Sequence, residues 1–173
     1  MAVKAGPSVP TYRHTVLLTA HILAAVGWLG CGLAVTVLTV AGVAGADPAT
    51  IYPAARMIAI WLVAPLAGIA MATGLLLTAL TSWGLLAHRW VTAKFAISVM
   101  LAGAVAMLLI PRLDTLATIA TGTGAETLTV AQRLPLAIAP ATASLLLGVN
   151  VALAVAKPTR WRRHSDTLGT DRS

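Results

Sequence analysis

The sequence predicts an all-α integral membrane protein, folded as a four-helix bundle. Four long apolar segments fill most of the 173 residues. Only 10% of the residues are charged and 58% are hydrophobic, with a mean hydropathy of +0.88. A soluble domain of this size needs roughly a quarter of its residues charged to solvate its surface. Lipid is therefore expected to cover much of the outside of this protein.

Each apolar segment is long enough to cross the hydrocarbon core, which takes about 20 residues of helix. The segments are continuously apolar rather than alternating, and an open sheet could not satisfy its backbone in lipid, so helices are expected. Pro111 is expected to end the third helix, and Pro135 to lie in the first turn of the fourth. The predicted spans are residues 15–43, 57–80, 91–110 and 134–156, which together form one bundle over residues 15–156.

The connections between these spans are short enough to make sequential helices antiparallel neighbours. Residues 44–56 and 81–90 form two short loops, and residues 111–133 form a longer one that is rich in threonine. We expect this third loop to hold at most a helical turn or two. The predicted topology is therefore up-down-up-down.

Basic residues set the predicted orientation. An even number of spans places both termini on one side, and that side carries nine of the 12 Lys and Arg residues. The positive-inside rule then makes residues 1–14 and the basic, disordered tail 157–173 cytoplasmic, in the inner (cytoplasmic) membrane. The net charge of +7 lies at span ends. This distribution indicates contact with the headgroups of a lipid bilayer and no nucleic-acid partner.

Four polar residues are predicted to lie at one depth within the membrane. Counted at about 1.5 Å per residue from the cytoplasmic span ends, His21 and Asn150 lie about 9 Å deep, and Thr73 and Ser98 about 10 Å. Polar groups prefer the bundle interior to lipid. We therefore expect these four side chains to converge.

His21 is the strongest candidate for a functional residue, because an ionisable group inside a membrane helix is costly. His14, His21 and Trp28 recur at intervals of seven and share one helix face. A neutral imidazole between the small Ala24 and Ala25 and an aromatic wall suits a flat cofactor such as haem. An equally open reading is that His21 only forms a hydrogen bond with a neighbouring helix.

Two short patterns resemble the small bacterial four- or five-span membrane proteins of the HemJ and CopD type. The similarity covers roughly residues 13–112, and its motifs are His21 with Trp28 and Gly30, and Trp90 with Lys94-Phe95. The resemblance implies a haem b site in which His21 is the axial ligand and Lys94 pairs with a propionate or a substrate carboxylate. CopD-type proteins are linked to copper.

The favoured prediction is a membrane protein that binds haem b or another porphyrin and is thereby capable of redox chemistry. Its candidate cofactor-binding residues are His21, Trp28, Lys94, Ser98 and Asn150, and its candidate metal ligands are His21 and His88. The sequence assigns no catalytic residue and leaves open whether the protein is an enzyme.

The alternative prediction is an accessory subunit without a cofactor, which binds a membrane partner protein or a second copy of itself. Small residues at helical spacing let helix backbones approach closely in lipid. Such pairs are Ala20 and Ala24, Gly27 and Cys31, Gly68 and Ala72, and Gly103 and Ala106. A small transporter is less favoured, because every acidic residue lies in a predicted loop or tail.

Overall fold

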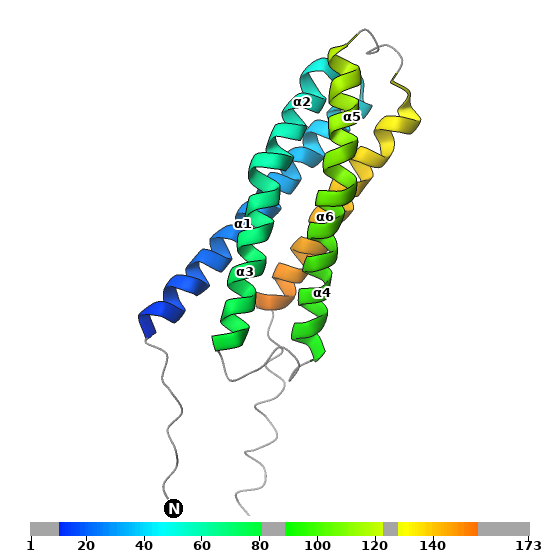
Figure 1. Ribbon diagram of the computed structural model, residues 1–173. Helices are drawn as coiled ribbons and strands as arrows, with labels where there is room; N and C mark the ends of the chain where they lie inside the picture. The colour runs from blue at the N-terminus through cyan, green and yellow to red at the C-terminus, as the bar shows by residue number, and fades with distance from the viewer. Residues whose placement is uncertain (1–10, 81–88, 123–127, 156–173) are drawn as a thin grey trace, which may run out of the picture.

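The computed structural model describes residues 11–80, 89–122 and 128–155, and these residues are helical almost throughout (Figure 1). The predicted tail at 157–173 and most of the N-terminal segment lie outside the described residues. The elements in chain order are α1 (Thr11–Val43), α2 (Pro48–Ile58), the π-helical turn η1 (Ala59–Val63), α3 (Ala64–Leu80), α4 (Arg89–Ala104), the π-helical turn η2 (Val105–Leu109), α5 (Ile110–Thr121) and α6 (Val130–Val155).

Four helical runs are long and apolar enough to cross a membrane. Two of them are continuous through a π-turn: α2, η1 and α3 form one run, and α4, η2 and α5 form another (Figure 1). This confirms the prediction of an all-α protein with four candidate membrane-spanning helices, as expected of a multi-pass membrane protein. The four spans are Tyr12–Val43, Pro48–Leu80, Phe95–Thr121 and Val130–Ala152.

The first predicted loop is mostly helix. Residues 44–56 were expected to be loop, but α2 begins at Pro48, so the connection is only a few residues long. Asp47 caps the helix: its carboxylate accepts hydrogen bonds from the Ala49 and Thr50 amides at 3.2 and 3.1 Å and from the Thr50 hydroxyl at 2.6 Å. Proline in the first turn reinforces this start. The Thr50 hydroxyl, followed by the Ala49 amide, holds the pKa of the Asp47 carboxyl below its ordinary value of 3.8.

The prediction that Pro111 ends the third span is wrong. The helix continues through Pro111 to Thr121, so the loop predicted at 111–133 holds about three helical turns and not one or two. The fourth helix begins at Val130, so Pro135 lies inside it and not in its first turn. The turn η2, just ahead of Pro111, accommodates that proline. There the Ile110 amide donates to the Val105 carbonyl, five residues back. A proline cannot donate an amide hydrogen bond and its ring crowds the carbonyl four residues earlier, so a wider turn just ahead of it relieves both problems. The same arrangement precedes Pro65, where the Ala64 amide donates to the Ala59 carbonyl.

The long helical runs extend beyond a bilayer core. The run from α2 to α3 contains 33 residues and is therefore about 50 Å long. The hydrocarbon core is about 30 Å thick, so part of the run lies outside it even at the steepest common tilt of about 40°. In α5, Leu113, Leu116, Ala117 and Ala120 are buried while Asp114, Thr115 and Thr118 are exposed. This one-sided pattern is typical of a helix whose other face meets water.

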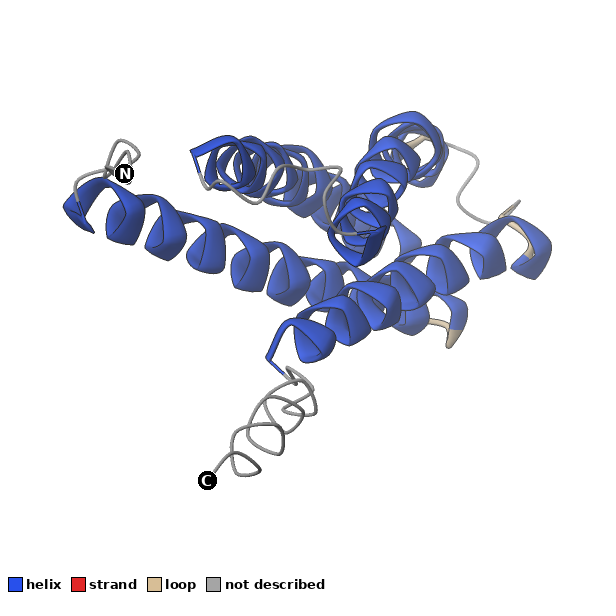
Figure 2. Ribbon diagram, turned by 90° about the horizontal axis from the view of Figure 1, so that it is seen from below, coloured by secondary structure: helices blue, strands red, loops and turns tan. Residues whose placement is uncertain are grey.

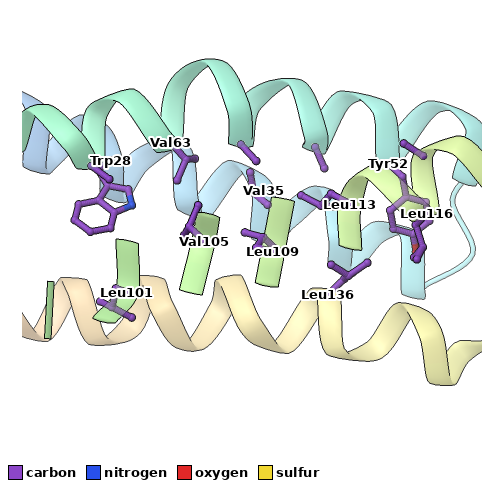
Figure 3. Packing of buried hydrophobic residues seen from close by; sticks show 14 of the residues in the cluster. Trp28, Val35, Tyr52, Val63, Leu101, Val105, Leu109, Leu113, Leu116 and Leu136 are labelled. Carbon is purple, nitrogen blue, oxygen red and sulfur yellow. The ribbon is translucent and has the colours of Figure 1, made fainter. Parts of the chain in front are cut away.

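The core lies between α1 and its neighbours. α1 packs against α2, α3 and α6, and α2 packs against α5. In the end-on view the N-terminal turns of α1 stand apart from α6 (Figure 2). Buried side chains form one row through the bundle, ending at Tyr52, Leu113 and Leu116 (Figure 3). We call the region where α2 and α5 meet the α2/α5 end.

An ion pair joins the two helices at the α2/α5 end. Arg56 Nε donates to Asp114 Oδ1 at 2.6 Å, and the two side chains are 42% and 55% exposed. Asp114→Asn should lower the free energy of unfolding by no more than about 1 kcal/mol, because water competes for both charges. The loss should shrink further at high salt. Unfolding measured at low and high NaCl, alone and combined with Arg56→Gln, checks this. A loss well above that figure would contradict it.

Only some of the small residues lie at contacts between helices. Ala24 is buried, and a Cβ at Gly27 would lie 3.2 Å from Leu66 Cδ1, so these small residues of the first span lie at contacts within the bundle. Gly68 and Gly103 differ, since a Cβ there would meet nothing within 4 Å. Their partner alanines, Ala72 and Ala106, are also exposed. These two pairs therefore face outward and do not join described helices.

Candidate functional site

His21 lies on α1 and reaches across to α3. Its Nδ1 lies 2.9 Å from the Ala70 carbonyl oxygen and 3.2 Å from the Thr73 hydroxyl oxygen. The Thr73 hydroxyl itself donates to carbonyls of its own helix, at 2.7 Å to Ile69 and 3.2 Å to Ala70. His21 therefore forms a hydrogen bond with a neighbouring helix, which is one of the two readings that the sequence left open.

These contacts fix the tautomer of the imidazole. A backbone carbonyl can only accept a hydrogen bond, so the short contact with Ala70 requires the proton on Nδ1. The Thr73 hydroxyl donates its proton to the Ile69 carbonyl, so its oxygen can only accept a hydrogen bond from Nδ1. In the neutral ring the lone pair then belongs to Nε2. Within the described part of the chain, no hydrogen bond engages that nitrogen.

A glycine on α3 makes room for the ring. A Cβ at Gly74 would lie 3.1 Å from His21 Cε1 and 3.4 Å from Nδ1, which is tighter than ordinary van der Waals contact. The sequence predicts His21 beside the small residues Ala24 and Ala25 of its own helix, whereas the close contacts in the structure are with Ala70 and Gly74 of α3. The signal was present in Ala70, Thr73 and Gly74, which lie three and four residues apart and so share one face of α3.

The four polar residues expected at one depth form two separate pairs. His21 pairs with Thr73 between α1 and α3. Asn150 Nδ2 donates to Ser98 Oγ at 3.4 Å, between α6 and α4. Among the described residues, no hydrogen bond joins one pair to the other. Each pair thus has the geometry of a local link between two helices.

Trp28 is buried, 5% exposed, and lines a partly open cavity of about 210 Å³. Along α1 it lies seven residues from His21, which is about 10 Å. The cavity walls come from α1, η1, α4, η2, α5 and α6, and they are apolar apart from a few groups such as Ser144 and Arg112. His21 is not among the lining residues. His21 and Trp28 are therefore in different surroundings, although the sequence predicts them on one face of the helix.

The remaining candidate ligands are only partly placed. Lys94 belongs to the first turns of α4, but its side chain falls outside what the structure describes, and His88 lies outside it altogether. His14 is in the first turns of α1 and is partly exposed. In residues 11–80, 89–122 and 128–155, no group of three or more His, Cys, Asp or Glu side chains could hold a metal ion.

No protein-family model, curated protein or solved structure matches the chain.

Proposed function

We propose that the protein binds haem b in the cytoplasmic membrane, with His21 Nε2 as an axial ligand to the iron. The observation that carries the proposal is the hydrogen bond from His21 Nδ1 to the Ala70 carbonyl. Histidines that ligate metals almost always donate their other ring N–H to a carbonyl, carboxylate or water, which fixes the tautomer and orients the ring. His21 has this arrangement, with Nε2 carrying the lone pair.

The surrounding residues have distinct parts in this proposal. Ala70 and Thr73 orient the imidazole, and Gly74 lets it approach α3. Lys94 would pair with a propionate, as the HemJ-type resemblance implies, and Ser98 and Asn150 would border the cofactor. Trp28 lines a cavity that His21 does not reach, so it has no part in this site. His88 is the candidate for a second ligand. Bound haem would supply one-electron chemistry, and this chain would contribute the ligand and a low-dielectric setting.

The same proposal includes the membrane topology. The helices would run up-down-up-down with both termini in the cytoplasm, because nine of the 12 basic residues then lie on the inner side. The α2/α5 end would face outward. Its exposed Asp114, Thr115 and Thr118 suit contact with water there.

His21→Ala should reduce the haem content of the purified protein by at least about tenfold, since even loss of a group supporting a ligand costs 10–100-fold in affinity. The measurement is the Soret absorbance per protein after expression in haem-replete cells. His14→Ala is the matched control, because it removes an imidazole from the same helix face and should keep the band. A protein without porphyrin, or a His21→Ala variant with its Soret band intact, would refute the proposal.

A second candidate function, binding a membrane partner, is favoured by the outward-facing small residues. Gly68 with Ala72 and Gly103 with Ala106 present surfaces that another helix could approach closely in lipid. A stoichiometric partner or second copy should then co-purify and be lost in the double variant Gly68→Leu, Gly103→Leu. Retention of that partner in His21→Ala would separate this function from the haem site.

A further inference from the structure

The cavity beside Trp28 is elongated along the bundle. Its lining runs from Leu101 and Leu147 at one end to Arg112 and Pro135 at the other. The 11 residues from Leu101 to Arg112 correspond to about 16 Å of helix. At about 210 Å³ the cavity exceeds the ~150 Å³ of an engineered apolar cavity that binds benzene, but it falls short of the ~300 Å³ at which pockets for drug-sized ligands begin. These dimensions suit a narrow, flexible apolar chain.

The cavity opens sideways, toward the surroundings of the bundle. Its deep walls are the buried Trp28, Val63 and Val105 (Figure 3). Its rim includes exposed residues from two facing runs, which are Leu108 and Arg112 on η2 and α5, and Pro135 and Ala139 on α6. Leu108 is 60% exposed. A chain from the surrounding lipid can therefore enter between these helices without passing through water.

Arg112 supplies a positive charge at one end of this cavity. Arg56 is paired with Asp114, and Arg133 donates to the Gly42 carbonyl at 3.3 Å. Arg112, by contrast, makes no ion pair or hydrogen bond with any residue in the described ranges. Its exposed guanidinium can therefore bind a carboxylate or a phosphate bidentately.

We propose that this cavity is a binding site for an anionic membrane amphiphile, whose alkyl chain lies against Trp28 and whose carboxylate or phosphate headgroup binds Arg112. The apolar walls would select the alkyl chain of the amphiphile. The positive charge at the rim would select its anionic headgroup. The site is separate from the proposed haem ligand, since His21 does not line it.

The test uses quenching of Trp28 fluorescence by amphiphiles with a brominated alkyl chain. The signal from Trp28 is the difference between the full-length protein and its Trp28→Phe variant. Three ligands share one chain and differ in the headgroup: a carboxylate, a phosphate and a neutral alcohol. Both anions should quench at concentrations about fivefold lower than the alcohol, the factor expected of one partly exposed ionic contact. Arg112→Gln should remove that advantage, and the ratio between carboxylate and phosphate identifies the natural headgroup.

Filling the cavity tests the chain site itself. Ala143→Leu adds bulk inside the cavity and should weaken quenching by all three ligands at least about fivefold, since an overfilled apolar site costs 1–3 kcal/mol. Ala34→Leu makes the same change on an exposed position of α1 and should have no effect. If Ala143→Leu does not fold, Ala104→Leu fills the cavity from α4. Quenching that is absent, or equal in the filled and parent proteins, would overturn the proposal.

Discussion

Leu113→Ala should lower the free energy of unfolding by about 2–5 kcal/mol, the range for truncating a fully buried leucine. Leu113 is 0% exposed and lies on α5, in the row of core side chains near Tyr52 and Leu116 (Figure 3). Removing its side chain leaves a void where α5 packs against α2. The loss is measured by reversible unfolding in detergent, followed by circular dichroism.

Leu108→Ala is the control for this experiment. Leu108 precedes Leu113 on the same run, is 60% exposed and lies on the outer surface of η2. Its truncation should cost less than about 1 kcal/mol, as expected of a position outside the core. Equal losses in the two variants would contradict the packing of α5 described above.

Gly74→Val should destabilise the contact between α1 and α3 by about 1–3 kcal/mol, as overpacking of a close contact generally does. Even a Cβ at this position would lie 3.1 Å from His21 Cε1, and valine adds two methyl groups to it. The imidazole must then move, so its hydrogen bond to the Ala70 carbonyl should weaken. The unfolding free energy and the ¹⁵N chemical shifts of histidine-labelled protein report the two effects.

Gly68→Val provides the comparison on the same helix. A Cβ at Gly68 meets nothing within 4 Å, so Gly68→Val crowds no neighbour. It changes the intrinsic helix propensity by the same amount as Gly74→Val does. The difference between the two variants therefore isolates the contact with His21. Unchanged histidine shifts in Gly74→Val would show that the ring does not pack against α3.

The number and type of the helices could be predicted from the sequence, but their ends could not. Composition and segment length predict four apolar helices, and the structure has four helical runs long and apolar enough to span a membrane. The proline at 111 misled because a π-turn absorbs it. Asp47-Pro48 has the opposite effect: the pair is common in loops, but Asp before Pro also starts a helix, as it does here.

The candidate site could be predicted only in outline. An inward-facing His21 follows from the cost of placing an imidazole in lipid. Its main partner, however, is a backbone carbonyl, which every residue carries and no sequence pattern marks. Depth alone suggested one cluster with Ser98 and Asn150, whereas the rotation of each helix about its axis separates them into two pairs. The cavity arises from imperfect packing of several helices, which a single chain pattern does not encode.

The two π-turns also set the rotational phase of the long helices. Buried residues recur every four positions through each turn, at 55, 59, 63 and 67 in one run and at 101, 105, 109 and 113 in the other. In a regular α-helix each such step overshoots a full circle by about 40°. The wider turns take up this excess, so one stripe of side chains faces inward along the whole run.

Each run therefore depends on its own length between the π-turn and the α2/α5 end. A residue deleted from one run alone would swing everything beyond it by about 100° and turn α2 away from α5, or α5 away from α2. Natural variation in this protein should therefore avoid single-residue insertions and deletions at both of these levels.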